Sequence, residues 1–274
     1  MPYTNLFSLQ EKVIIVTGGT GVLGEAFIRG IHEAGGSVVI LGRNQEEGEA
    51  RAEELRAAGG QAIFAKADVL NEADLIAARD LTLQTYGRID GLVNGAGGNL
   101  AGAVIQPDQN LFDMDLPALR QAFELNLFGT LQPTLIFGKW IAESERGGSI
   151  VNISSMAAQS AITRVLGYSM AKGSVDNFTR WMSVELAQRY GDKVRMNAIA
   201  PGFFITHQNR DLLTNQDGSY TTRGAAVIRN TPYQRFGKPD ELIGALVWLL
   251  SDASAFVSGE IVSVDGGFSV FSGV

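Results

Sequence analysis

Short apolar runs alternate with amphipathic, helix-like stretches along most of the chain. Seven runs predict β-strands, and they lie at Val13–Val16, Val38–Leu41, Ala62–Ala65, Gly91–Val93, Ser149–Ile153, Arg195–Ala200 and Ile261–Val264. The runs are continuously apolar, which is typical of strands that are covered on both faces. The stretches between them have helical spacing, as in Glu46–Ala58, Glu72–Tyr86 and Leu119–Ile141. This alternation predicts an α/β fold with a doubly wound, seven-stranded parallel sheet and helices on both faces.

Two long segments interrupt the alternation. Residues 101–116 contain Pro107 and lack a clear period, and residues 203–231 are long and polar. Both follow strands at their carboxyl ends, where open parallel sheets bind ligands. Loops of this length in a compact domain are usually functional covers or else disordered. We therefore predict one domain over residues 1–274 with a substrate-covering segment at about 203–231; surface decoration is the alternative.

Composition excludes several classes of protein. Of the 274 residues, 45% are apolar and 19% are charged, enough for a large core. The net charge of −7 disfavours a nucleic-acid partner. Cysteine is absent and the two histidines, His32 and His207, are far apart, so we expect no metal site. The start of the chain, Met1–Leu6, has no basic region before an apolar stretch, and no apolar run spans a bilayer. We expect a cytoplasmic protein with no membrane contact.

A glycine-rich turn directly follows the first strand. Gly19, Gly21 and Gly24 satisfy G-x-G-x-x-G and lead into a predicted helix at Glu25–Ala34. Glycines at this spacing allow a tight turn and let backbone N–H groups approach a pyrophosphate. The turn therefore predicts a dinucleotide site, with a glycine-rich turn that binds nothing as the alternative. No Gly-Lys-Ser/Thr follows, which excludes a P-loop.

The end of the second strand bears on which dinucleotide is bound. An acid there usually binds the ribose 2′-hydroxyl of NAD, but this strand ends in Gly42-Arg43-Asn44 and the first acid is Glu46. The Arg43 guanidinium could instead bind a 2′-phosphate. This favours NADP(H), with NAD(H) as the alternative. Arg43 could also stack on the adenine or face solvent.

A tyrosine and a lysine lie on one helical face. Tyr168 and Lys172 are four residues apart, so the ammonium can favour the phenolate and lower the pKa of Tyr168. Tyr168 then becomes a proton donor to a carbonyl oxygen or an acceptor from an alcohol. By itself this spacing is common, and an ordinary helix surface is the better explanation of the pair. Three other residues favour a functional role for the pair. Ser155 ends a strand at the edge of the sheet where ligands bind, Asn94 ends another strand, and Asn126 lies in the predicted helix at 119–141.

The glycine turn, the strand-end Asn94-Gly95-Ala96-Gly97, Ser155 and the Tyr168/Lys172 pair together resemble the short-chain dehydrogenase/reductase family over essentially the whole chain. The resemblance implies a single Rossmann domain and NAD(P)-dependent interconversion of alcohols and ketones. It also implies a homodimer or homotetramer.

The resemblance assigns four catalytic roles. Tyr168 is the acid/base, and Ser155 polarises the carbonyl. Lys172 binds the nicotinamide ribose and lowers the pKa of Tyr168. Asn126 holds a water that relays protons. Cofactor contacts are assigned to the glycine turn and to strand ends, at Gly18, Thr20, Gly21, Val22, Leu23, Gly24, Arg43, Asn44, Asp68, Val69, Asn94, Ala96, Gly97, Ile153, Tyr168, Lys172, Pro201, Gly202, Phe204 and Thr206. Val22 stands where the family has glycine, and Gly95 where it commonly has asparagine.

Within the family, residues 203–210 and 264–269 resemble sugar-acid enzymes, namely a candidate D-mannonate oxidoreductase branch with gluconate 5-dehydrogenases as relatives. A sugar acid needs a cation for its carboxylate and amides or hydroxyls for its alcohols. The substrate residues predicted on this basis are Asn99, Ser155, Arg164, Phe203, His207 and Asn209. A surface or subunit-interface role is the alternative for Arg164, and a solvent-facing position for His207. The alternative functions are a ketoacyl or other carbonyl reductase and a non-catalytic dinucleotide sensor.

Overall fold

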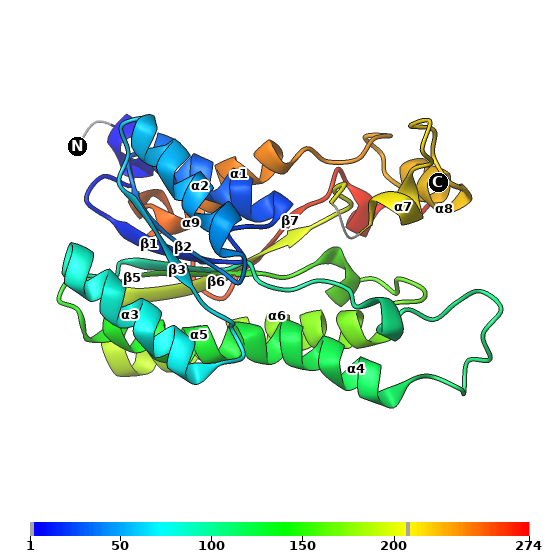
Figure 1. The fold of residues 1–274 in the computed structure, drawn as a ribbon, viewed down its shortest axis with the longest axis horizontal. Helices are drawn as coiled ribbons and strands as arrows, with labels where there is room; N and C mark the ends of the chain where they lie inside the picture. The colour runs from blue at the N-terminus through cyan, green and yellow to red at the C-terminus, as the bar shows by residue number, and fades with distance from the viewer. Residues whose placement is uncertain (1–2, 207–208, 274) are drawn as a thin grey trace.

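A computed structural model describes residues 3–206 and 209–273. Within these residues, seven parallel strands form one sheet in the order β3-β2-β1-β4-β5-β6-β7 (Figure 1). The strands are β1 (Val13–Thr17), β2 (Ser37–Gly42), β3 (Ala62–Lys66), β4 (Gly91–Asn94), β5 (Gly148–Ile153), β6 (Val194–Pro201) and β7 (Ile261–Val264). All seven predicted strands are confirmed, each to within one residue at either end. The order reverses between β1 and β4, and parallel sheets bind ligands at such a point.

Helices cover both faces of the sheet, which confirms the predicted doubly wound fold (Figure 1). One face carries α1 (Val22–Glu33), α2 (Gln45–Ala57) and α9 (Ile243–Leu250). The opposite face carries α3 (Glu72–Tyr86), α4 (Leu116–Phe123), α5 (Gly129–Glu143) and α6 (Leu166–Tyr190). Two short helices, α7 (Arg210–Leu213) and α8 (Thr222–Arg229), lie beyond the carboxyl ends of the strands (Figure 1).

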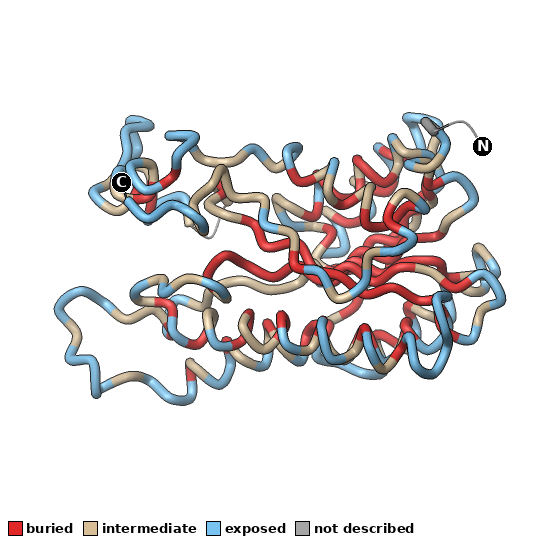
Figure 2. Tube along the Cα trace, turned by 180° about the vertical axis from the view of Figure 1, so that it is seen from behind, coloured by how far each residue is buried: buried red, intermediate tan, exposed pale blue. Residues whose placement is uncertain are grey.

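Successive residues of each strand enter opposite cores. Ile14 of β1 packs with Phe27 of α1 on one face, whereas the next residue, Ile15, packs with Phe137 of α5 on the other. The central strands are therefore buried along their whole length (Figure 2). This two-sided burial is the physical reason why the strands read as continuous apolar runs.

The helix predicted at 119–141 is interrupted in the structure. A π-helical turn, Glu124–Phe128, separates α4 from α5. The Asn126 side chain lies in this turn and donates from Nδ2 to the carbonyl of Ala122 at 2.7 Å. A side chain that enters the backbone hydrogen-bond ladder breaks its regular i−4 pattern, and π-turns of this kind are frequent at functional sites. The prediction of one continuous helix was therefore wrong at the position of a predicted catalytic residue.

The strand register places the candidate chemistry along one edge. Thr17 at the end of β1 pairs with Leu41 of β2 and with Asn94 of β4, so these three strands end level with one another. The two irregular segments predicted from the sequence, 101–116 and the described parts of 203–231, lie at the same end of the molecule (Figure 1). None of the helices in the described residues is long and apolar enough to cross a bilayer.

Candidate active site

A cleft of about 400 Å³ lies at the carboxyl edge of the sheet. It gathers most of the predicted site residues: Gly18, Thr20, Gly21, Val22, Leu23, Gly24, Arg43, Asp68, Val69, Ala96, Gly97, Asn99, Ile153, Ser155, Tyr168, Lys172, Pro201, Gly202, Phe204, Thr206 and Asn209. Sequence reasoning did not assign contacts to other residues of its lining: Leu41, Gly42, Ala67, Gly98 and Leu125. Most of these are strand-end neighbours of the predicted residues, so the register of the sheet brings them in.

The turn after β1 has the shape that a pyrophosphate requires. Gly18 has φ +67°, and a Cβ there would lie 2.8 Å from the carbonyl of Gly95. A Cβ on Gly24 would lie 2.2 Å from the carbonyl of Gly18. The N-cap of α1, Gly21, makes no side-chain capping bond, so it leaves the first N–H groups of the helix available for an anion. Val22 is the first residue of α1, and its side chain lines the cleft.

Arg51 of α2 braces this turn, which the sequence did not indicate. Its Nη1 donates to the carbonyls of Gly19 and Gly21 at 2.8 and 3.0 Å. The guanidinium thus satisfies two carbonyl oxygens on one side of the turn and holds the turn in place. The residues present fit a dinucleotide pyrophosphate, because the turn is tight, free of side-chain caps and held from behind.

Replacing Gly24 with alanine is expected to weaken dinucleotide binding about tenfold, because the new Cβ must push the turn out of position. The dissociation constant from fluorescence titration measures this effect. Gly244→Ala in α9 is the matched control, since a Cβ there meets nothing within 4 Å. Equal affinities in the two variants would contradict the assigned role of the turn.

At the far end of the cleft, Arg43 follows β2 as predicted. Its side chain is 76% exposed, and Nη1 lies 3.9 Å from Oδ2 of Asp68. The neighbouring Asn44 does not line the cleft; its side chain caps α2 by accepting from the N–H of Glu47 at 3.3 Å. A capping role is the ordinary one for asparagine at this position.

Asn94 also lies behind the cleft and does not line it. The side chain is fully buried, and Nδ2 donates to Oγ1 of Thr134 at 2.9 Å and to Oδ1 of Asn152 at 2.8 Å. Its amide therefore joins β4 to β5 and α5. Thr17 makes the contact with the loop after β4, because its Oγ1 accepts from the N–H groups of Gly95 and Ala96, both at 3.1 Å.

Three predicted catalytic side chains converge in the cleft. Tyr168 and Lys172 lie one turn apart on α6, with Nζ 5.7 Å from the centre of the phenol ring. Lys172 is 3% exposed and donates to the carbonyl of Ile153 at 2.7 Å. The hydroxyls of Tyr168 and Ser155 are hydrogen-bonded to each other. Ser155 is held in turn by the N–H of Ala157, which donates to its Oγ at 3.1 Å.

Asn126 lies immediately behind this group. Its Nδ2 donates to the carbonyl of Gly98 at 2.9 Å, and its Oδ1 accepts from the N–H of Gly98 at the same distance. A Cβ on Gly97 would lie 2.6 Å from Oδ1 of Asn126 and 3.3 Å from Nζ of Lys172. Asn126 therefore clamps the loop after β4 beside the ammonium of Lys172.

Comparison with known proteins agrees with this arrangement. Residues 21–269 match the family model described as enoyl-(acyl carrier protein) reductase. An oxidoreductase of Bacillus subtilis, UxuB, is 44% identical to the chain over 97% of the chain and 98% of the relative. The chain belongs to the short-chain dehydrogenase/reductase family.

Two solved structures of short-chain dehydrogenases/reductases are especially similar. A candidate D-mannonate oxidoreductase of Haemophilus influenzae with bound NAD is 38% identical, with a TM-score of 0.89 and coverage of 97% of this chain and 98% of that one. A gluconate 5-dehydrogenase of Burkholderia cenocepacia in complex with NADP and tartrate is 32% identical, with a TM-score of 0.84 and the same coverage. The family's oxidoreductases act on alcohol and ketone groups, and its members bind NAD or NADP.

The pKa shifts at this short-chain dehydrogenase site differ from the prediction. Burial raises the pKa of Tyr168, and the hydrogen bond with Ser155 opposes that rise only in part. Burial lowers the pKa of Lys172 to about 8, against the charge of Asp176. The prediction that Lys172 lowers the pKa of Tyr168 is not met in the protein alone, because removing the phenolate from water is the larger effect.

Asp176 is a buried acid of the site that sequence reasoning missed. It is 4% exposed and lies one turn beyond Lys172 on α6, where its carboxylate accepts a hydrogen bond from Ser154. Burial raises its pKa. The spacing of four residues from Lys172 is the signal that could have revealed it.

The predicted substrate residues separate into two groups. Asn99, Ser155 and Asn209 line the cleft, and Asn209 also holds the covering segment by donating to the carbonyl of Phe204 at 2.8 Å. Phe203 instead packs edge-on against Phe268, with ring centres 5.2 Å apart, and does not line the cleft.

Two predicted substrate residues remain. Arg164 lies outside the cleft lining and donates from Nε to the carbonyl of Ile105 at 2.8 Å. His207 lies outside the described residues.

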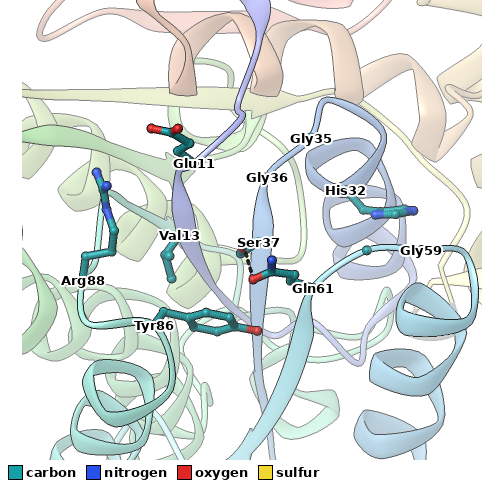
Figure 3. Close-up of a pocket in the computed structure, with 11 residues that line it drawn as sticks. Glu11, Val13, His32, Gly35, Gly36, Ser37, Gly59, Gln61, Tyr86 and Arg88 are labelled. Atoms are coloured by element: carbon teal, nitrogen blue, oxygen red, sulfur yellow. Dashed lines mark hydrogen bonds between the residues drawn. The ribbon is translucent and has the colours of Figure 1, made fainter.

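A second hollow, of about 520 Å³, lies at the opposite edge of the sheet (Figure 3). Its wall includes Glu11, His32, Gln61, Tyr86 and Arg88, and it contains none of the predicted site residues. The arginine in this wall, Arg88, already forms an ion pair with the buried carboxylate of Asp90. The residues predicted to be catalytic all lie at the other edge.

Proposed function

We propose that this protein is an NAD(P)-dependent oxidoreductase that interconverts a secondary alcohol and a ketone on a sugar acid, of the D-mannonate/fructuronate or gluconate/5-ketogluconate type. The observation that carries the proposal is the meeting of Ser155, Tyr168 and Lys172 in the same cleft as the glycine turn. The sugar-acid class draws on the two structural relatives and on the polar covering segment.

Each side chain then has a defined task. When bound, the nicotinamide gives or accepts the hydride at the reacting carbon. In ketone reduction Tyr168 donates its proton to the substrate oxygen, and Ser155 donates a hydrogen bond to that oxygen. The ammonium of Lys172 stabilises the phenolate left on Tyr168, and it is held in position by the carbonyl of Ile153. Asn126, next to Lys172, holds the water that returns a proton to it.

The raised pKa of Tyr168 suits the reduction direction. A buried phenol stays protonated at neutral pH, which is the form that donates. Alcohol oxidation needs the phenolate, so it depends on the positive charges of Lys172 and of the oxidised nicotinamide ring to favour that form. Both directions therefore use the same hydroxyl in opposite protonation states.

Arg43 supports a preference for NADP(H), with NAD(H) as the alternative. The Arg43→Ala variant is expected to lose about 10- to 100-fold in kcat/KM with NADP+, because a charge-assisted bond to the 2′-phosphate disappears. With NAD+ the change is expected to stay within about twofold, since the 2′-hydroxyl offers no charge. Steady-state rates with each cofactor measure this difference. Arg146→Ala, which removes an exposed arginine before β5, is the control. A loss of equal size with both cofactors would contradict a phosphate role.

A substrate panel tests the proposed function. Hexonates and ketohexonates are each supplied with NAD(H) and NADP(H), and turnover is followed at the nicotinamide absorbance. Turnover of a hexonate or ketohexonate above that of simple ketones is the expected result. Turnover of acyl thioesters alone would favour the other candidate, a ketoacyl or related carbonyl reductase; the description of the matched family model shares the acyl thioester with this candidate, although an enoyl reductase acts on a carbon–carbon double bond. Cofactor binding with no turnover of any compound would favour a dinucleotide sensor.

Assembly into a homodimer or homotetramer is also part of the proposal. Large apolar side chains are exposed on α5 and α6, including Leu135 (54%), Trp181 (60%) and Val184 (55%). Exposed apolar side chains gathered on neighbouring helices are typical of an interface.

A further inference from the structure

Two arginines that do not line the cleft, Arg164 and Arg223, are brought close to each other from segments far apart in the sequence. Arg164 lies between Ser155 and Tyr168, and Arg223 lies in the first turn of α8. The Arg223 guanidinium donates to Oγ1 and to the carbonyl of Thr163 at 3.4 and 3.3 Å. This contact brings α8 of the covering segment against the stretch that leads into Tyr168.

Both guanidiniums have unused hydrogen-bonding capacity. Arg164 donates from Nε to Ile105 and from Nη2 to Oε1 of Gln106, both at 2.8 Å. A guanidinium has five N–H donors, so each of the two arginines keeps three after its contacts with the residues that the structure describes. Neither forms an ion pair with any residue that the structure describes.

The two guanidinium groups repel each other, and no acidic side chain of the described residues is paired with either of them. Burial, and after it the positive charge of Arg164, lowers the pKa of Arg223. Such a pair gains from an anion that accepts hydrogen bonds from both sides, since the anion removes the repulsion and uses the free donors. A carboxylate has the charge and the planar shape that match a guanidinium fork.

The backbone holds Arg164 in an unfavourable conformation. Its φ is +76°, in the left-handed region that side chains with a Cβ rarely adopt. Ile105 fixes it from both sides, because the Ile105 N–H donates to the carbonyl of Arg164 at 2.9 Å while Nε of Arg164 donates to the carbonyl of Ile105. Strain of this kind, retained by specific contacts, is typical of a functional site and not of a free surface side chain.

We infer that Arg164 and Arg223 together bind the carboxylate of the substrate, an inference that rests on the sugar-acid function proposed above. Arg164 is four residues before Tyr168, so their Cα atoms are at most about 14 Å apart. An extended six-carbon acid, with carbon–carbon bonds of about 1.5 Å, places its carboxylate roughly 6 Å from carbon 5. The side chains of Arg164 and Tyr168, with such a substrate between them, are together long enough to span the distance between the two Cα atoms.

A fixed carboxylate gives the pair a role in specificity. With the acid end held by Arg164 and Arg223, the chain length between the carboxylate and the reacting carbon decides which hydroxyl faces Tyr168. The pair therefore selects acids over uncharged polyols and selects the carbon that reacts. It does not take part in proton transfer.

Arg223 is the better residue to test. Substitution of Arg164 would also release the loop at Ile105, whereas among the described residues Arg223 donates only to Thr163. The test compares Arg223→Gln with the wild type on a hexonate and on the uncharged hexitol with the same hydroxyls. Arg229→Gln removes an exposed arginine from the last turn of the same helix and is the matched control.

Arg223→Gln is expected to raise KM for the hexonate about 10- to 100-fold, as for the loss of a charged hydrogen bond, with kcat little changed. Its kcat/KM for the hexitol and its affinity for the dinucleotide are expected to stay within about twofold of the wild type. Arg223→Lys, which keeps the charge without the fork, is expected to recover part of the loss. Thermal melting compares the folding of the three variants.

Three results would overturn the inference, and they can be distinguished from one another. If the wild type prefers the hexonate and Arg223→Gln keeps that preference, the arginine pair is not the carboxylate site and the proposed function stands. If the wild type does not prefer the hexonate to the hexitol, the sugar-acid function fails and the inference fails with it. An equal loss on both compounds would indicate a structural role for Arg223 and also contradict the inference.

Discussion

The Tyr168→Phe variant is expected to turn over about a thousandfold more slowly than the wild type, a loss in the range typical of general acid–base groups. Phenylalanine keeps the ring on the same face of α6 and removes only the hydroxyl that is hydrogen-bonded to Ser155. The substrate oxygen then has no proton donor, whereas the cofactor contacts remain. The dissociation constant for the dinucleotide is therefore expected to change by no more than about twofold, since the ring itself stays in place.

Single-turnover rates and fluorescence titration measure the two quantities separately. Tyr190→Phe is the control, because Tyr190 ends the same helix and is partly exposed, away from the cleft. A turnover near that of the wild type in Tyr168→Phe would refute the assignment of the proton donor. A loss of dinucleotide binding equal to the loss of turnover would point to a structural role for the hydroxyl.

Replacing Lys172 with methionine is expected to lower kcat/KM for ketone reduction about a hundredfold at pH 7. The variant is also expected to lose the decrease of kcat/KM that the wild type shows at alkaline pH. Burial lowers the pKa of Lys172 to about 8, so the ammonium is present below that pH and is lost above it. The phenolate formed on Tyr168 then has no adjacent cation. In the wild type, kcat/KM is therefore expected to fall as pH rises through about 8, by up to tenfold per pH unit.

Tyr168 does not account for this fall, because burial raises its pKa and keeps it protonated across the same range. Profiles of kcat/KM against pH measure the effect, since they report groups of the free enzyme. Lys139→Met, which removes an exposed lysine of α5, is expected to keep both the rate and the profile of the wild type. A profile in Lys172→Met that still falls above pH 8 would show that another group titrates there.

The sequence alone was sufficient for the elements that depend on neighbouring residues. Each strand is an apolar run of four to eight residues whose two faces are both buried, so its pattern is visible without knowing what covers it. Asn71 caps the helix at 72–86 through residues two and three positions away, because its side chain accepts from the N–H groups of Ala73 and Asp74. The glycine turn and the Tyr168/Lys172 spacing are local for the same reason. Their chemistry follows from residues within one turn of each other.

Only the tertiary structure decided the features that depend on residues distant in the sequence. Asn44 and Asn94 were both predicted to bind the cofactor. In the structure Asn44 caps a helix and Asn94 joins two strands, and no local sequence pattern distinguishes these roles from ligand binding. The pKa of Tyr168 depends on how much of the phenol is removed from water, and that is a property of the packed site. Arg223 reaches Thr163 across 60 residues of sequence. The chain's local patterns therefore determined its fold and its candidate catalytic pair, whereas packing between remote segments decided which polar groups face the cleft, in which charge state, and beside which partners.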